Sequence, residues 1–252
     1  MSARASPRLR RVLDFAIFVA LVLASWQLAH LWGGEVAMTT PLGTLRYTVR
    51  TLASAEFWPH ATATVTAFFI ALLLAASSGI LIGALLGHHR LSGEVTEPIL
   101  VAIYSIPKVT LYPIILLFFG IGISAEIAFG ALHGVIPITL FTMNAVRNIK
   151  PVFIKTVRVM RLRPWALLRS VLLPATLPEV FTGLRVGFSL TLIGTLLSEM
   201  FGSRRGLGFM LMNAIGLHNM EVIMSITFML VLFAGTVNAG LLVIDHRLHR
   251  RV

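Results

Sequence analysis

The chain offers few residues that could perform enzyme chemistry. It has no cysteine and only three lysines, Lys108, Lys150 and Lys155, none of which follows a glycine. The phosphate-cradling pattern G-x-x-x-x-G-K-[ST] is therefore absent, as is the zinc-protease pattern H-E-x-x-H. Without cysteine there is also no thiol nucleophile, disulfide or thiolate metal site. The chain cannot hydrolyse ATP through a P-loop, and we expect it not to be an enzyme.

Histidines are the remaining candidates for metal chemistry. Two pairs lie close in sequence, His88 with His89 and His246 with His249, and both pairs fall in basic segments. Two ligands are fewer than the three or four that a protein zinc site uses. We therefore expect no metal site and no bound cofactor in this chain.

Polar and ionisable side chains inside apolar segments are candidates for a transport pathway, because a charge inside a bilayer is costly and usually functional. Lys108, His133 and Glu199 are such residues. Each also has a structural interpretation: a snorkelling lysine, a neutral hydrogen-bonded histidine and a glutamate at the interface. We predict a pathway that includes Tyr104, Lys108, His133, Ser189, Thr195 and Glu199.

The composition requires lipid as a solvent. Of the 252 residues, 57% are hydrophobic and only 12% are charged, whereas soluble domains carry about 25% charged residues. The formal net charge is +11. Because the basic residues fall in loops and not on one soluble face, this charge indicates membrane topology and not nucleic-acid binding.

Six apolar stretches are long enough to cross a bilayer, which takes about 20 helical residues. Open strands are excluded, because they would leave backbone groups unpaired in hydrocarbon. The sequence predicts an all-α polytopic membrane protein with one domain over 1–252 and a core at 60–245. The predicted spans are 12–32, 62–86, 98–119, 125–146, 179–201 and 222–244.

Basic residues are distributed unevenly between the two sides of these spans. With the N-terminus in the cytoplasm, fifteen arginines and lysines lie inside and four outside, while Lys108 and Arg185 fall within spans. The positive-inside rule then places both termini in the cytoplasm. The longest exported segment is 33–58, in which Tyr47 and Trp58 could anchor at the interface.

Glycine and proline positions predict how two spans pack. Gly79, Gly83 and Gly87 repeat every four residues, which places them on one face and lets another helix approach closely. Pro107 and Pro113 each remove a backbone donor from the third span. Such a helix is tolerated where protein or a wet cavity satisfies the freed carbonyls, so we expect it to face the bundle interior.

The cytoplasmic segment at about 148–177 is longer than a connector needs to be. Within it, Trp165, Leu168 and Leu172 share one face of a short amphipathic helix. Pro164 suits the first turn of this helix, and Pro174 is predicted to end it. A helix of this kind can dock into a groove of another protein or lie on the lipid surface. The residues alone leave both possibilities open.

Several stretches resemble the permease subunits of bacterial ABC importers. The cytoplasmic loop of that family has the pattern E-A-A-x₃-G-x₉-I-x-L-P, whose end is matched by Leu173 and Pro174, with Val171 in place of the isoleucine. The similarity extends over 60–240 and is closest to the branch that handles nitrate, sulfonates, taurine, bicarbonate and thiamine precursors. The matching stretches are "GILIGALLGHHR" (79–90), "EPILVAIYSIPKVTLYPIILLFFGIG" (97–122) and "LPEVFTGLRVGFSLTLIGTLLSEMFGSRRGLGFML" (177–211).

The resemblance implies a type I ABC importer permease in the bacterial inner membrane. It implies two permease copies, two cytoplasmic ATPase subunits that bind ATP and Mg²⁺, and an extracytoplasmic substrate-binding protein. The ATPases would dock on the 161–174 loop helix and switch the pathway between inward-facing and outward-facing states. The residues expected at this docking and coupling site are Arg161, Arg163, Pro164, Trp165, Leu168, Arg169, Leu172 and Pro174.

The chain also departs from the family pattern. The loop positions of the family's Glu, Ala, Ala and Gly are occupied here by Lys155, Thr156, Val157 and Arg161. Arginine cannot adopt the positive φ that the glycine allows, so the turn before the loop helix should differ. Lys108 replaces a second proline of the third span and would favour an anionic substrate if it faces the pathway.

The main alternative is a stand-alone secondary transporter or channel. Such a protein would need carboxylates near the bilayer midplane to couple to an ion. Glu126 and Glu199 are the candidates, but both are expected near the outer boundary. A membrane enzyme is a further alternative, for which the chain has no convincing set of residues.

Overall fold

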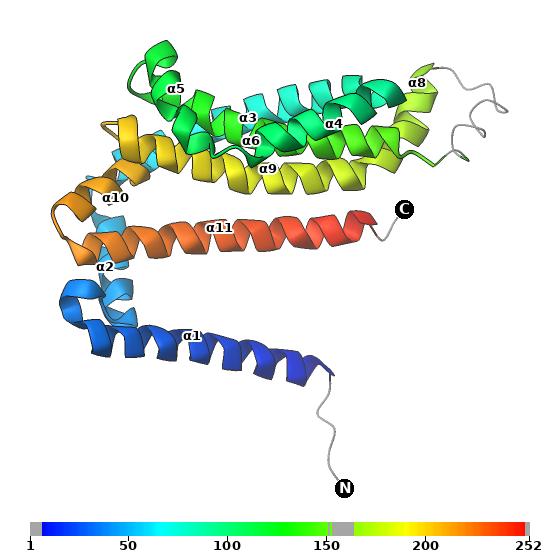
Figure 1. Ribbon diagram of the computed structural model, residues 1–252. Coiled ribbons are helices and arrows are strands. Elements are labelled where there is room, and N and C mark those ends of the chain that lie inside the picture. The colour runs from blue at the N-terminus through cyan, green and yellow to red at the C-terminus, as the bar shows by residue number, and fades with distance from the viewer. Residues whose placement is uncertain (1–6, 151, 153–163, 250–252) are drawn as a thin grey trace, which may run out of the picture. The chain divides into compact units, whose positions relative to one another are not determined.

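The computed structural model describes residues 7–150, 152 and 164–249, and nearly all of these residues are helical (Figure 1). No strand occurs in that part of the chain, so the all-α prediction is confirmed. The elements are α1 (Pro7–Ala37), α2 (Pro41–Ala53), α3 (Phe57–His88), α4 (Arg90–Ser105), η1 (Lys108–Leu111), α5 (Tyr112–Phe119), α6 (Ile123–Arg147), α8 (Pro164–Leu167), η2 (Leu168–Leu172), α9 (Leu173–Gly202), α10 (Leu207–Gly216) and α11 (Met220–His249).

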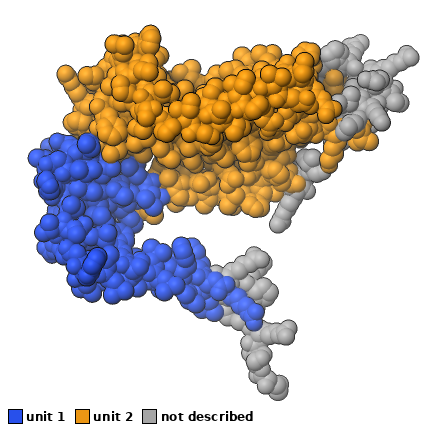
Figure 2. Space-filling model, in the orientation of Figure 1, with its two compact units in different colours: residues 1–57, 211–231 blue, residues 58–210, 232–252 orange. Residues whose placement is uncertain are grey.

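The chain forms two compact units (Figure 2). Unit 1 contains residues 1–57 and 211–231, and unit 2 contains residues 58–210 and 232–252. The long helix α11 contributes its first part to unit 1 and its second part to unit 2.

The predicted spans correspond to long apolar helices. Among the described residues, five helices are long and apolar enough to cross a membrane, and the bent pair α4 and η1–α5 would make a sixth span. The prediction of about six spanning helices is therefore confirmed.

The third predicted span is not one straight helix. It bends by 82° between Ser105 and Lys108. Ile106 has an extended backbone with ψ of 133°, as expected for a residue before proline, and Pro107 then leads into the 3₁₀ turn η1. Tyr104 and Ile106, on either side of the end of α4, are exposed in the single chain, whereas Tyr112 of α5 is buried.

Helix α6 is the centre of unit 2, where it lies beside α3, α4 and α9 (Figure 1). Small residues make this packing possible. An added Cβ at Gly83 of α3 would lie 2.6 Å from the carbonyl oxygen of Thr139, and one at Gly87 would lie 2.6 Å from that of Met143. At Gly79 it would lie 2.8 Å from Cγ2 of Ile138. The three glycines thus allow backbone-to-backbone contact between α3 and α6.

A second apolar contact within unit 2 joins α3, α9 and the last part of α11. Phe68 and Phe188 pack edge to face with ring centroids 5.1 Å apart, and Leu192 is buried beside them. Leu241 of α11 packs against this cluster. In a membrane these contacts gain mainly from close van der Waals packing, because lipid chains are as apolar as the side chains.

Unit 1 is built around the turn between α1 and α2. The indole nitrogen of Trp26 donates a hydrogen bond to the carbonyl of Thr39 at 3.0 Å, and the Trp26 ring lies beside Phe228 of α11. Thr40 caps α2 by accepting a hydrogen bond from the backbone N–H of Gly43. The exported segment predicted at 33–58 therefore contains an amphipathic helix, whose buried face holds Thr44 and Thr48.

The prediction that Pro174 ends the loop helix is wrong. Helix α8, the π-helical turn η2 and α9 follow one another without a break, and Trp165–Gly202 forms one stretch of 38 residues. Proline lacks a backbone donor, but here it lies in the first turn of α9, directly after the wider turn η2. The hydroxyl of Thr176 donates to the carbonyl of Leu172 at 2.8 Å and so satisfies a carbonyl of that wide turn.

Candidate functional site

A cavity of about 260 Å³ with a mixed lining, which includes the apolar side chains of Val186 and Leu190, lies in unit 2 between α4, α9 and α11. Tyr104 comes from α4, Arg185 and Ser189 from α9, and Asn238 from α11. Arg185 and Ser189 are four positions apart and therefore share one face of α9. The structure thus brings two predicted pathway residues, Tyr104 and Ser189, to one cavity, together with an arginine and an asparagine that the sequence analysis did not select.

Lys108 lies next to this cavity without lining it. Its Nζ donates a hydrogen bond to the carbonyl of Tyr104 at 3.1 Å and lies 4.6 Å from the centroid of the Tyr104 ring. The ring and the ammonium thus form a cation–π contact, which holds the positive charge of Lys108 beside Tyr104. One positive charge, on Arg185, therefore lines the cavity, and a second, on Lys108, lies beside its Tyr104.

Arg185 is paired within unit 2. Its Nε lies 3.4 Å from Oδ2 of Asp245, and the two side chains are 24% and 9% exposed. The same carboxylate accepts a hydrogen bond from the hydroxyl of Thr182 at 2.8 Å, while Nδ1 of His249 lies 3.3 Å away. The sequence could have indicated Arg185, because it is an arginine inside an apolar span. It could not have indicated Asp245, which lies near the predicted end of the last span.

His133 and Thr195 lie elsewhere, in the contact between α6 and α9. His133 is buried, and its Nδ1 donates a hydrogen bond to the carbonyl of Phe129 at 2.9 Å. An added Cβ at Gly194 would lie 2.8 Å from the His133 ring. The hydroxyl of Thr195 is also buried and donates to the carbonyl of Thr191 at 3.0 Å. Both residues therefore fill the helix contact, and the structure does not bring them to the cavity.

Glu199 lies at the opposite end of α9 from Trp165 and holds the loop between α9 and α10. Its Oε2 accepts hydrogen bonds from the hydroxyl of Thr64 at 2.9 Å and from the backbone N–H of Gly208 at 2.8 Å. Thr64 in turn accepts the N–H of Leu207 at 2.8 Å. Glu199 is fully buried, and its Oε1 finds no partner among the described residues. This arrangement clamps a loop and does not line the cavity with Arg185.

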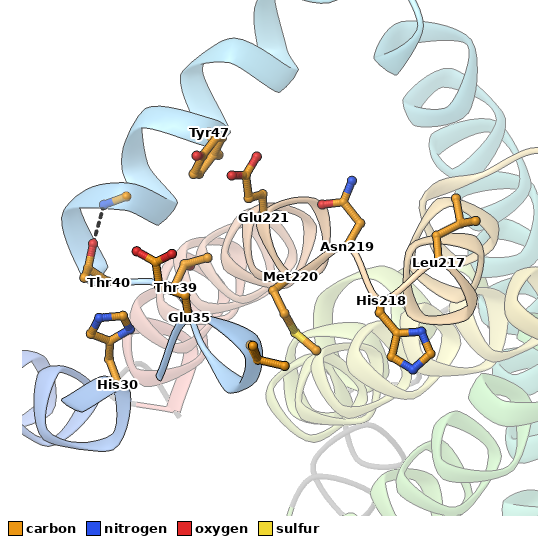
Figure 3. A pocket seen from close by; sticks show the side chains of 12 residues that line it. His30, Glu35, Thr39, Thr40, Tyr47, Leu217, His218, Asn219, Met220 and Glu221 are labelled. Atoms are coloured by element: carbon orange, nitrogen blue, oxygen red, sulfur yellow. Dashed lines mark hydrogen bonds between the residues drawn. The ribbon is translucent and has the colours of Figure 1, made fainter. Parts of the chain in front are cut away.

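A larger cavity of about 660 Å³ lies in unit 1 (Figure 3). Its lining includes His30, Glu35, Tyr47 and Glu221. The carboxylate of Glu221 beside Tyr47 raises the pKa of the Tyr47 phenol above its ordinary value. Two carboxylates make the cavity unfavourable for an anion, and it contains none of the predicted pathway residues.

The predicted docking segment is described from Pro164 onward. Trp165 is 69% exposed, Arg169 and Pro174 are exposed, and Leu172 is half-buried. Pro164 begins α8 and Leu168 begins η2. Arg161 and Arg163 lie outside the described residues, as do Lys155, Thr156 and Val157, at which the chain departs from the family pattern.

The histidine pairs form contacts other than a metal site. The rings of His88 and His89 contact each other edge to face. Nδ1 of His246 donates a hydrogen bond to the carbonyl of Leu242, and Nδ1 of His249 donates to that of Asp245. Within residues 7–150, 152 and 164–249, no three His, Asp or Glu side chains are placed so that they could hold a metal ion.

Comparisons with known proteins agree with the helical architecture. Residues 79–252 match the family described as "binding-protein-dependent transport system inner membrane component". The chain is 32% identical to a riboflavin transport system permease protein of Chloroflexus aurantiacus, over 95% of this chain and 93% of that protein. It is 29% identical to a nitrate import permease protein of Leptolyngbya laminosa, over 90% and 85% of the two chains. It is 27% identical to a taurine transport system permease protein of Escherichia coli, over 77% and 70%.

Proposed function

Because the chain belongs to the family of binding-protein-dependent transport system inner membrane components, we propose that it forms the substrate pathway of an ATP-driven importer and takes its energy from separate ATPase subunits. It is a multi-pass inner-membrane permease subunit of the ABC importer type. Members of this family are transport subunits and not enzymes, which agrees with the missing P-loop.

The ATPase subunits dock on the helical segment that begins at Pro164. An exposed apolar ring at Trp165, followed by the exposed cation of Arg169, suits a groove in a partner protein. This segment is continuous with α9, which also carries Arg185. A displacement of Trp165 by the ATPase is therefore transmitted along one helix to the cavity. The π turn at Leu168–Leu172 is the place where that helix can bend.

Both termini lie in the cytoplasm. This orientation rests on the excess of arginine and lysine near the N-terminus, between α6 and α8, and near the C-terminus. It places the Trp165 end of the continuous stretch Trp165–Gly202 on the ATPase side and the Glu199 end on the side of the substrate-binding protein.

The transported solute is a small anion. The observation that carries this proposal is that Arg185 lines the cavity and Lys108 lies beside it, because guanidinium and ammonium donors favour a ligand with negative charge. At about 260 Å³ the cavity is smaller than the roughly 300–1,000 Å³ of sites for drug-sized ligands. Nitrate and the sulfonate group of the zwitterion taurine, both named for relatives, are of suitable size. A flavin, named for a third relative, is the second candidate.

The complete importer contains two copies of this chain, two ATPase subunits that bind ATP and Mg²⁺, and an extracytoplasmic binding protein. The family description supports the dependence on a binding protein. Two identical copies are the simplest arrangement for a chain that supplies one half of a symmetric pathway.

Affinity purification from the native membrane in gentle detergent, followed by mass spectrometry, tests this proposal. Recovery of a P-loop ATPase at equal copy number supports it. Recovery of the chain alone, as an oligomer that transports without an ATPase, would instead support a stand-alone secondary transporter or channel. Ligand screening of the recovered binding protein with nitrate, taurine and riboflavin distinguishes the anion from the flavin.

A further inference from the structure

Arg185 takes part both in the lining of the cavity and in an ion pair. It lines the cavity with Tyr104, Ser189 and Asn238, and it forms an ion pair with Asp245. The Arg185 Nε is buried but has no hydrogen-bond acceptor among the described residues, even though Oδ2 of Asp245 is 3.4 Å away. Arg185 and Asp245 therefore attract each other as two opposite charges, without a well-directed hydrogen bond from Nε of Arg185. The guanidinium thus keeps donor capacity that a second anion could use.

Asp245 does not depend on Arg185 alone. It is buried, and its Oδ1 accepts a hydrogen bond from Thr182 at 2.8 Å. Nδ1 of His249 lies 3.3 Å from the same oxygen. If the Arg185 side chain turned toward the cavity, the carboxylate would keep these polar neighbours. Opening of the pair therefore avoids most of the penalty of an isolated buried charge.

We propose that Asp245 is a positioning residue that competes with the transported anion for Arg185, so that binding of an anion in the cavity opens the Arg185–Asp245 pair. The inference rests on the proposed function, because it takes the cavity to be part of an anion pathway. A guanidinium binds oxyanions and carboxylates through the same planar donors, so the two cannot both be bound fully. Asp245 therefore weakens the resting affinity of the cavity for an anion and keeps Arg185 oriented while the cavity is empty.

The competition links cavity occupancy to the docking segment. Thr182 and Arg185 are three positions apart on α9, and both contact Asp245 of α11. When an anion takes Arg185, α9 is left attached to this carboxylate through Thr182 alone. The helix that carries Trp165 is continuous with α9. A looser attachment of α9 to α11 therefore changes the position of the docking surface at Trp165.

The test is an anion titration of the purified full-length chain in gentle detergent. Thermal stability is followed against nitrate and, separately, methanesulfonate, with sodium chloride used to hold ionic strength constant. The wild type should be stabilised by these probe anions. Asp245→Asn should lower the half-saturating concentration about three- to tenfold, because the competing charge is removed while the shape is kept. Arg185→Gln should abolish the response.

Two further variants separate competition from a general loss of packing. Glu97→Gln breaks a different ion pair of unit 2, in which NH2 of Arg147 lies 2.6 Å from Glu97, and it should leave the half-saturating concentration unchanged. Asp245→Glu keeps the competing charge, so its half-saturating concentration should stay at or above the wild-type value. This variant also keeps the test valid if Asp245→Asn does not fold.

Three results would overturn the inference. These are an Asp245→Asn variant with wild-type half-saturation, an Asp245→Glu variant whose value falls, or a wild type that responds to neither anion. The proposed function has its own readout, which is recovery of the ATPase in the affinity purification. If the ATPase is recovered with the chain but anions bind equally well with and without Asp245, this inference is wrong and the proposed function still stands.

Discussion

The hydroxyl of Thr64 donates a hydrogen bond to Oε2 of Glu199, at 2.9 Å, and so joins α3 to α9 across 135 positions of the chain. The same carboxylate oxygen accepts the backbone N–H of Gly208, which ties the loop after α9 to the helix pair. A carboxylate this deeply buried is expensive to desolvate, and its hydrogen bonds offset part of that cost. Glu199 is therefore a structural clamp in this chain.

Replacement of Glu199 by alanine should lower stability by about 1–3 kcal/mol, because the N–H of Gly208 and the hydroxyl of Thr64 lose their acceptor. Glu199→Gln should cost clearly less, since an amide oxygen can take the place of Oε2 and the amide nitrogen that of the unpartnered Oε1. Thermal unfolding of the purified protein in detergent measures both. Equal losses in the two variants would mean that the negative charge matters and not the acceptor.

Gly206→Ala should be destabilising for two reasons. Gly206 has φ of +113°, a conformation that costs a residue with a side chain about 1–3 kcal/mol. An added Cβ would also lie only 2.5 Å from Oε1 of Glu199. The matched control is Gly240→Ala on α11, where no heavy atom lies within 4 Å of the new methyl group. A melting temperature that falls equally in both variants would contradict this interpretation.

Gly83→Ala should separate α3 from α6. The new methyl group would lie 2.6 Å from the backbone oxygen of Thr139 and 2.7 Å from Cβ of Thr142, and neither atom can rotate away. Overpacking of this kind costs about 1–3 kcal/mol. Ser77→Ala, on an exposed part of α3, serves as the control and should change the melting temperature little. Tolerance of alanine at position 83 would show that the two helices are not in close contact.

Much of the fold could be predicted because a bilayer restricts what a chain can do. Long apolar runs must be helices there, and glycines four residues apart must share a face, as Gly79 and Gly83 do against α6. The bend near Pro107 is signalled by the proline, but its 82° angle depends on how α5 packs against α6. The helix end predicted at Pro174 is wrong because a proline stops a regular helix, whereas here the preceding π turn relieves the missing donor.

The candidate site was predicted only in part. Tyr104 and Ser189 were selected and do line the cavity, while His133 and Thr195 fill the contact between α6 and α9. A single sequence shows which residues are polar within a span but not which way each faces. The pairing of Arg185 with Asp245 joins residues sixty positions apart, and no local pattern indicates such a contact.

Loss of the positive charge at Lys108 should weaken transport of an anion. With Lys108→Gln, the concentration of nitrate or taurine for half-maximal uptake into vesicles that hold the complete importer should rise about tenfold, equivalent to about 1.4 kcal/mol. Lys108→Arg keeps the charge over the Tyr104 ring and should remain close to the wild type. Lys108→Glu should have the largest effect. Unchanged uptake in Lys108→Glu would remove Lys108 from the pathway.

Trp165→Ala should uncouple ATP hydrolysis from transport without disturbing membrane insertion. The ring is 69% exposed in the single chain, so its removal should alter the stability of the chain itself by no more than about 0.5 kcal/mol. An exposed tryptophan buried by a partner often contributes 2 kcal/mol or more to binding, which corresponds to a loss of affinity of about thirtyfold. Recovery of the ATPase in affinity purification and substrate uptake should therefore both fall.

The matched control for this variant is Trp32→Ala on α1, which removes a tryptophan that is 95% exposed and lies far along the sequence from the docking segment. Trp32→Ala should leave ATPase recovery and uptake unchanged. If Trp165→Ala behaves in the same way, the helix that begins at Pro164 is not the ATPase docking surface, and the exposed indole lies on the lipid surface instead. Reduced ATPase recovery with normal melting temperature would place the docking contact at this ring, because the chain would be intact and only the partner lost.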